Sequence, residues 1–216
     1  MDFYLFHALN KKSFEKIKSL EFEKFVQKAK DEGKIRHIGF SFHDEFKVFK
    51  KIVEAWDKWD FCQIMYNYMD TRHQAGERGI RLAVKKGIDI IVMEPIRGGQ
   101  LAKEPPAEIK KLWEKFPVKC SYADGALQWI WHHQEIPLVL SGMSTMQQVK
   151  ENIKSAENAK VRLFSDKEME LFKKIRRTYL KRSPIRCTSC KYCEPCPQGV
   201  ATVSYTHLTL PTKRIV

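Results

Sequence analysis

The sequence predicts an α/β fold in which strands alternate with amphipathic helices around a parallel sheet. Five short apolar runs recur along the first 157 residues, and between them apolar residues return at the three- and four-residue spacing of a helix. The connections between the runs are long enough for the crossovers that parallel strands require. The expected strands cover residues 3–7, 37–42, 61–67, 89–95 and 137–143.

The helices are predicted from apolar faces and from the residues that stop a helix. The face formed by Phe22, Phe25, Val26 and Ala29 ends before Gly33, a residue that commonly terminates helices. Similar faces predict helices at residues 46–56, 78–86 and 121–133, and another that ends near residue 157. Ser165 and Glu168 form a capping box, which predicts one further helix outside the repeat.

A barrel is the favoured closure of this sheet, because no Gly-x-Gly-x-x-Gly motif follows any strand. The strand at residues 89–95 is almost continuously apolar, so we expect it to be covered on both faces. Polar residues and glycines gather at the carboxyl ends of all five strands, which form the active-site face of a barrel. These residues are His7, Ser41, His43, Gln63, Asn67, Glu94, Arg97, Gly98, Gly99, Gly142, Met143 and Ser144.

Composition limits the classes of function. The chain has 216 residues with a net charge of +13, and its N-terminus does not resemble a signal peptide. No apolar run approaches the ~20 residues that span a bilayer, so we expect a cytoplasmic protein with no membrane partner. The basic excess suits either nucleic acid or solvated helix faces with a phosphate-bearing cofactor. Acids interleave with most of the lysines, which favours the second interpretation and predicts no nucleic-acid partner.

A run of four cysteines near the C-terminus predicts a metal centre. Cys187, Cys190, Cys193 and Cys196 are each separated by two residues and precede Pro197, close to a ferredoxin run whose last spacer is three residues. Zinc is the alternative, although structural zinc sites usually have two Cys-x-x-Cys pairs with a segment between them. The remaining cysteines, at positions 62 and 120, are interpreted as ordinary barrel residues of the kind that is often buried.

The motifs FYLFHALN, GKIRHIGFSFH, FCQIMYNYMD, VMEPIRGGQLA and LSGMSTMQQVKENI resemble, in order, strand-end motifs of the aldo-keto reductases. With the cysteine run, residues 1–202 are most similar to the branch that carries a C-terminal ferredoxin-type segment. The resemblance implies a TIM (β/α)8 barrel that binds NADP(H) or NAD(H) without a Rossmann motif. It also implies hydride transfer to or from a small-molecule carbonyl or alcohol substrate, and an electron-transfer partner is a further expectation.

The resemblance assigns roles to individual residues. His7 matches the family's catalytic histidine, Ser41 and Gln63 match positions that bond the nicotinamide amide, and Gln148 and Asn152 match positions near the adenine. The loop from residue 93 to 101 would lie beside the nicotinamide and pyrophosphate, and residues 142–145 would present helix N–H groups to phosphate. The complete expected cofactor-binding set is Ser41, Gln63, Met93, Glu94, Pro95, Arg97, Gly98, Gly99, Leu101, Gly142, Met143, Ser144, Gln148 and Asn152.

Two choices stay open at this stage. NADP and NAD both remain, because no basic residue directly follows Ser144, although Lys150 lies one turn further on. For the expected [4Fe-4S] cluster, Cys187, Cys190 and Cys193 would hold one cubane, while Cys196 either completes it or serves a second cluster. A different function is a zinc-binding, cysteine-rich module on an α/β scaffold that contacts nucleic acid.

The expected organisation is a partial barrel at 1–160, a helix and linker at 161–183, and an iron–sulfur segment at 184–201. Residues 202–216 include VSYTHLTLPT, which resembles a translated DNA-sequencing adapter, so we expect a non-native tail. The family's catalytic aspartate, tyrosine and lysine belong to earlier strands, and residues 3–7 look like the fourth strand of eight. Tyr4 and Tyr66 do not lie in the tyrosine's motif. We therefore expect the last five β/α units of the barrel and an inactive fragment.

Overall fold

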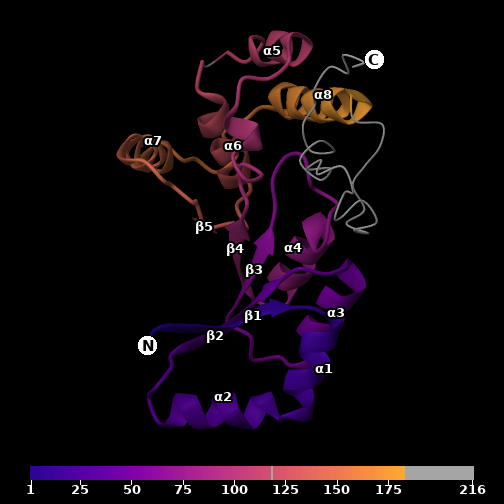
Figure 1. The fold of residues 1–216 in the computed structure, drawn as a ribbon, viewed down its shortest axis with the longest axis vertical. Helices are drawn as coiled ribbons and strands as arrows, with labels where there is room; N and C mark the ends of the chain where they lie inside the picture. The colour runs from indigo at the N-terminus through magenta and orange to yellow at the C-terminus, as the bar shows by residue number, and fades with distance from the viewer. Residues whose placement is uncertain (118, 183–216) are drawn as a thin grey trace, which may run out of the picture. The chain divides into compact units, whose positions relative to one another are not determined.

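The computed structural model describes residues 1–117 and 119–182, and one of its two compact units contains a sheet of five parallel strands (Figure 1). The strands follow one another in sequence order across the sheet, from β1 to β5. Every neighbouring pair is parallel, as successive β/α units of a barrel require. The strands are β1 (Phe3–Leu9), β2 (His37–Phe42), β3 (Phe61–Met65), β4 (Asp89–Met93) and β5 (Leu138–Val139).

Helices occupy the connections between the strands and follow the last of them. They are α1 (Lys11–Ser19), α2 (Phe22–Asp31), α3 (Phe46–Ala55), α4 (Gly76–Lys85), the 3-10 helix η1 (Gln100–Ala102), α5 (Ala107–Trp113), α6 (Tyr122–Trp131), α7 (Met146–Glu157) and α8 (Asp166–Arg182). The predicted helices at 46–56, 78–86 and 121–133 are confirmed within two residues at each end, which is the usual uncertainty of helix boundaries.

One face of the sheet is covered by an aromatic core that joins the strands to the first helices. Phe6 of β1 and Phe40 of β2 both contact Trp59, with ring centroids 6.1 and 4.9 Å apart. Phe22 of α2 stacks on the same indole, and Phe49 of α3 contacts Phe40. Because side chains alternate along a strand, the residues between these positions lie on the opposite face, here called the open face.

A glycine allows β2 and β3 to approach closely on the open face. Gly39 lies opposite Phe61 in the register of the two strands. A Cβ at Gly39 would lie 2.5 Å from the carbonyl oxygen of Phe61 and 2.6 Å from its ring. The side chain of Phe61 therefore fills the space that any other residue at position 39 would need.

The amino ends of the strands are joined by Asp60. Its carboxylate accepts a hydrogen bond from the Ile38 amide at 2.7 Å and pairs with the Lys30 ammonium at 2.8 Å. Burial is the largest influence on this carboxyl and acts to raise its pKa, but the bonds from Lys30 and Ile38 outweigh it and lower the pKa. These bonds hold α2 and β2 at the edge of the sheet opposite the predicted site.

A second compact unit contains α5 and α8, and it is distinct from the unit formed by residues 1–104 and 119–165. Trp113 and Phe116 contact Phe172 of α8, with ring centroids 5.6 and 4.9 Å apart. Arg182 at the end of α8 lies 3.9 Å from Glu108 of α5. The predicted helix after Ser165 is confirmed, and α5, which the sequence pattern did not indicate, is its packing partner.

Three expectations about the strands and cysteines were wrong. The predicted strand at residues 137–143 is only two residues long, because it pairs with β4 at Leu138 and Val139 alone. The open face of β4 is only half-buried at Ile91 and Met93, so this strand is not fully covered on both faces. Cys120 is exposed rather than buried, whereas Cys62 is buried as expected.

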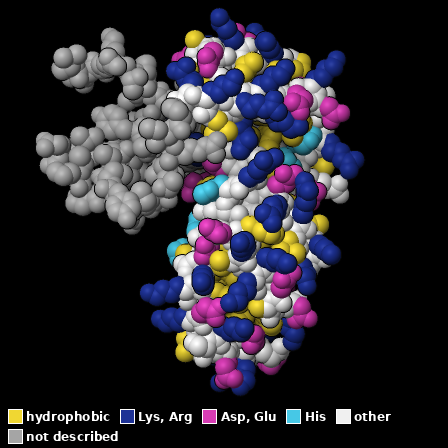
Figure 2. Space-filling view, turned by 90° about the vertical axis from the view of Figure 1, so that its right-hand side faces the viewer, with side chains coloured by type: hydrophobic (Ala, Val, Ile, Leu, Met, Phe, Trp, Pro, Cys, Tyr) yellow, Lys and Arg dark blue, Asp and Glu magenta, His cyan; other side chains and the backbone are white. Residues whose placement is uncertain are grey.

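Charge is distributed over the surface in mixed sign. Figure 2 shows Lys and Arg side chains interspersed with Asp and Glu over the visible face instead of collected in one basic patch. Many of these charges pair, as Lys51 does with Glu15 and Arg81 with Glu77. Among the described residues, no helix is long and apolar enough to cross a membrane.

Candidate functional site

A row of polar side chains crosses the open face near the carboxyl ends of the strands. Ser41 of β2 lies opposite Gln63 of β3, and Gln63 lies opposite Ile91 of β4. Neighbouring strands in a sheet lie about 4.8 Å apart, so the side chains of one row are within reach of a single ligand. His7 of β1 belongs to the same face, because Phe6 before it points into the aromatic core.

His7 is exposed and lies where β1 departs from regular pairing. The register of β1 with β2 shifts between Phe6 and Leu9, and Ala8 has a φ of 52°. Within the described part of the chain, no hydrogen bond, ion pair or ring contact involves the His7 imidazole. The ring is therefore available to a ligand on the open face.

Ser41 and Gln63 differ in how far their polar groups are already used. Ser41 is 2% exposed, and its Oγ accepts a hydrogen bond from the Ala8 amide at 2.7 Å. A hydroxyl group can accept two bonds and donate one, so the Ser41 proton is still available. The Gln63 side chain is half-buried and has no hydrogen bond to another described residue. Together they present donors and an acceptor suited to a carboxamide.

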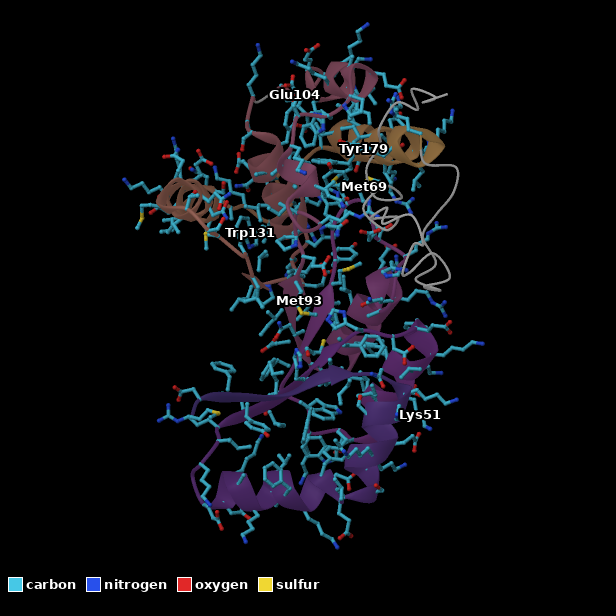
Figure 3. All side chains as sticks on the ribbon, viewed as in Figure 1. Lys51, Met69, Met93, Glu104, Trp131 and Tyr179 are labelled. Atoms are coloured by element: carbon cyan, nitrogen blue, oxygen red, sulfur yellow. The ribbon has the colours of Figure 1, made fainter. Side chains whose placement is uncertain are left out.

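The segment after β4 has an unusual backbone conformation. Glu94 and Arg97 have φ values of 50° and 52°, and Gly98 and Gly99 have values of 60° and 84°. Left-handed conformations cost a residue with a Cβ atom stability, and they recur at ligand-binding loops. The amides of Gly98 and Gly99 make no backbone hydrogen bond to the rest of the described chain. The segment begins beside Met93, the last residue of β4 (Figure 3).

Two contacts tie this segment to the loop after β3. The Nδ2 of Asn67 donates to the carbonyl oxygen of Glu94 at 3.2 Å, and Arg97 Nε lies 3.0 Å from an Asp70 carboxylate oxygen. Asn67 is fully buried, and its Oδ1 accepts bonds from the amides of Met69 and Asp70, both at 3.0 Å. The predicted cofactor residue Arg97 is therefore already paired with a carboxylate.

The amino end of α7 is capped by its own side chains. Thr145 Oγ1 accepts a bond from the Gln148 amide, and Gln148 Oε1 accepts bonds from the amides of Ser144 and Thr145. These contacts use amide groups that we expected to be free for phosphate. In an α-helix the next two amides, of Met146 and Gln147, have no partner within the helix.

The remaining predicted residues lie either in the segment after β4 or around the amino end of α7. Pro95 and Leu101 are buried beside the segment after β4, whereas Glu94 is exposed. Gly142, Met143 and Ser144 are exposed ahead of α7. The Nδ2 of Asn152 donates to Ser141 Oγ at 3.0 Å, so Asn152 holds the loop before its own helix.

Two nearby groups that could ionise are kept neutral. Burial is the main cause that raises the pKa of the Tyr66 phenol, and the ring lies 5.2 Å from that of Trp129. Burial likewise raises the pKa of the Cys62 thiol, which lies on the helix-covered face. Tyr4 packs against Phe6 on that face. None of the three is placed to act on a ligand at the polar row.

The expected metal ligands and the expected tail at 202–216 lie outside the described residues. The ligands are Cys187, Cys190, Cys193 and Cys196. In the part of the chain that is described, no group of three or more His, Cys, Asp or Glu side chains could hold a metal ion.

The structure brings His7, Ser41, Gln63 and Met93 to the open face, and the other predicted residues lie in the segment after β4 or around the amino end of α7. Sequence reasoning missed the Asp70 carboxylate that pairs with Arg97. It also missed the left-handed conformation of Ala8, for which an alanine gives no signal. Asn67 was noted as a strand-end residue, but its bonds to the segment after β4 were not predicted.

Solved structures of known proteins share this fold. The aldo-keto reductase AKR11C1 from Bacillus halodurans, in its holo form, is 24% identical with a TM-score of 0.62, and the match covers 81% of this chain and 60% of that chain. A thermostable aldo-keto reductase, Tm1743, in complex with the inhibitor epalrestat, is 19% identical with a TM-score of 0.61 and the same two coverages. The chain thus spans about three fifths of the length of these structures.

Family comparison gives the same result from the sequence. A search of curated proteins found no match. The model of the aldo/keto reductase family, however, matches residues 1–177, which include all five strands and most of α8. The chain therefore belongs to the aldo/keto reductase family.

Proposed function

We propose that this chain carries part of the active site of a nicotinamide-dependent oxidoreductase that interconverts a small carbonyl compound and its alcohol. The observation that carries the proposal is the row of His7, Ser41 and Gln63 on the open face of a family-matched parallel sheet. Its unused donors and acceptor fit a carboxamide beside a histidine that is free to bond an oxygen. NADP(H) or NAD(H), when bound, would supply or accept the hydride.

Ser41 and Gln63 would hold the nicotinamide amide. Ser41 Oγ already accepts the Ala8 amide, so we assign its free proton to the carboxamide oxygen of the nicotinamide. The Gln63 amide can both donate and accept, so it would pair with the rest of the carboxamide. This pairing fixes the orientation of the ring relative to His7.

His7 would bind and polarise the substrate oxygen. An imidazole N–H that donates to a carbonyl oxygen stabilises the negative charge that develops there during reduction. The absence of other partners for His7 among the described residues supports this role. The ring would make a hydrogen bond to substrate, and the transferred proton would come from outside the described face.

The two loops would hold the phosphate groups of the cofactor. Gly98 and Gly99 offer amides from a left-handed turn, and Met146 and Gln147 offer the free amides of α7. Arg97 is paired with Asp70, so its role is to fix the loop as much as to carry charge. Met93, Glu94, Pro95, Leu101, Gly142, Met143, Ser144, Gln148 and Asn152 remain proposed cofactor-binding residues.

We also propose that Cys187, Cys190, Cys193 and Cys196 hold a [4Fe-4S] cluster, or part of two. Four closely spaced thiolates are the donor set of such clusters, which carry electrons or stabilise a fold. A cluster of this kind suits a reducing compartment such as the cytoplasm. After anaerobic reconstitution, broad visible absorbance with stoichiometric iron and sulfide would support it, and stoichiometric zinc in a colourless protein would refute it.

Equilibrium binding of NADPH and NADH to the 216-residue protein tests the nicotinamide site. Gln63→Ala should weaken binding about 3- to 10-fold, the value of one or two neutral hydrogen bonds. Gln27→Ala, which removes an exposed amide on α2, is the matched control and should leave affinity unchanged. Equal affinity of both variants would refute the site, and steeply salt-dependent binding to DNA without any to nicotinamide would favour the nucleic-acid alternative.

A further inference from the structure

The end of β1 contains a bulge whose consequences reach the candidate site. Pairing with β2 is one to one from Phe3 to Phe6, but Leu9 pairs with Phe42, only two residues beyond Phe40. Residues 7 and 8 together therefore face Ser41. Bulges of this kind re-aim side chains and recur next to active sites.

The bulge determines which face each side chain meets. Side chains alternate along a regular strand, so Leu9 would share the open face with His7 if pairing had continued without interruption. The extra residue instead places Leu9 with Phe42, which contacts Phe49 in the aromatic core, and Leu9 is 1% exposed. β1 thus presents His7 to the open face and still buries Leu9.

Two features of the bulge are unfavourable by themselves: the left-handed conformation of Ala8 and the loss of a strand partner for its amide. Ala8 has a left-handed φ of 52°, which a residue with a Cβ atom rarely adopts. Its amide has left the ladder between the strands and would be unpaired without another acceptor. Ser41 Oγ is that acceptor at 2.7 Å, and Ser13 Oγ donates to the Ala8 carbonyl oxygen at 3.3 Å.

We infer that Ser41 is a positioning residue whose hydroxyl fixes the bulge that holds His7 on the open face. The part that concerns His7 in catalysis depends on the function proposed above. The Ser41 hydroxyl would serve two functions. One lone pair accepts the Ala8 amide and orients β1, while the proton remains available to a ligand. If the Ser41 hydroxyl had no role beyond satisfying its own hydrogen bonds, its removal would leave the position of the His7 ring unchanged.

NMR spectroscopy of the 216-residue protein, without cofactor, tests this role. Ser41→Ala should raise the hydrogen-exchange rate of the Ala8 amide at least about 10-fold and shift the ring signals of His7. Ser41→Thr keeps the oxygen and should restore both. The control is Ser121→Ala, which removes another serine hydroxyl that accepts a backbone amide and should leave the His7 signals unchanged.

A second variant tests the inference even if Ser41→Ala does not fold. Ala8→Gly relieves the left-handed strain, so a protein that lacks the hydroxyl should fold more readily in this background. The double variant Ala8→Gly/Ser41→Ala still lacks the acceptor for the residue 8 amide, so its His7 signals should differ from those of Ala8→Gly alone.

Several results would overturn the inference. They are unchanged His7 signals in Ser41→Ala, no restoration by Ser41→Thr, an equal His7 change in Ser121→Ala, or a double variant whose His7 signals match those of Ala8→Gly alone. Because no cofactor is present, these outcomes are independent of the NADPH titration. Failure of wild-type NADPH binding would refute the proposed function alone, and unchanged His7 signals would refute the positioning role alone.

Discussion

Substitution of Gly39 by alanine should weaken the pairing of β2 and β3, on which the polar row depends. The new Cβ would lie 2.5 Å from the Phe61 carbonyl oxygen and 2.6 Å from two ring carbons of Phe61. Ordinary contacts of a Cβ atom begin near 3.4 Å. The oxygen belongs to the backbone, so no side-chain rotation relieves that contact, and the strands must separate by roughly 1 Å.

The expected loss of stability is that of an overpacked core, about 1–3 kcal/mol. For a chain of this size each kcal/mol lowers the melting temperature by about 2–4 °C, so the expected shift is about 2–12 °C. Urea denaturation followed by circular dichroism should show a lower midpoint with little change in slope.

Two further variants separate the clash from a general effect of alanine. Gly142→Ala is the control, because a Cβ at Gly142 would have no described atom within 4 Å and the φ of this residue is not in the left-handed region. Its stability should therefore stay within about 0.5 kcal/mol of wild type. Adding Phe61→Leu to Gly39→Ala should not restore stability, because the carbonyl contact remains. A Gly39→Ala protein as stable as wild type would refute the close approach of the two strands.

Three other predictions concern the two loops, the amino edge and the thiols. Asn67→Ala should cost about 1–3 kcal/mol in denaturation experiments, because it removes the bonds of a fully buried side chain to the amides of Met69 and Asp70 and to the Glu94 carbonyl oxygen; a change under about 0.5 kcal/mol would contradict this. The pKa of the Asp60 carboxyl is lower in the folded protein, so its contribution to folding stability is present above about pH 4 and is lost as the pH falls. Between about pH 6 and about pH 3, the melting temperature of Asp60→Asn should therefore fall less than that of the wild type. Peptide mapping after iodoacetamide treatment of the native protein should find Cys120 modified and Cys62 protected, and the reverse order of labelling would contradict the structure. Cys120 is exposed as a residue, but partial burial of its thiol and the neighbouring Asp124 carboxylate raise its pKa to about 11, so its labelling rate should increase as pH rises.

The repeated β/α pattern could be predicted because each element carries its own apolar periodicity. β2 has the predicted bounds. α3 and α4 each carry apolar side chains on one face, and that face is the buried one. α1 was missed because only Phe14 and Ile17 mark an apolar face in a lysine-rich stretch, and its cap pairs Asn10 with Ser13 in place of the usual acidic residue.

The parts of the site that could not be predicted depend on contacts between distant residues. The ion pair of Arg97 and Asp70 joins two loops 27 positions apart, and each residue alone looks like an ordinary loop charge. The bulge at Ala8 depends on Ser41, 33 positions away. β5 is short because its pairing with β4 stops after two residues, which its apolar sequence does not reveal.

The most direct test of the candidate site is an amide chemical-shift map of the 216-residue protein during titration with NADPH. Changes should concentrate on the open face and its loops, at Ser41, Gln63 and Gly98, and the helix-covered face around Phe49 should stay unchanged. Absence of saturable changes, or changes confined to the helix-covered face, would contradict a nicotinamide site at the carboxyl ends of these strands.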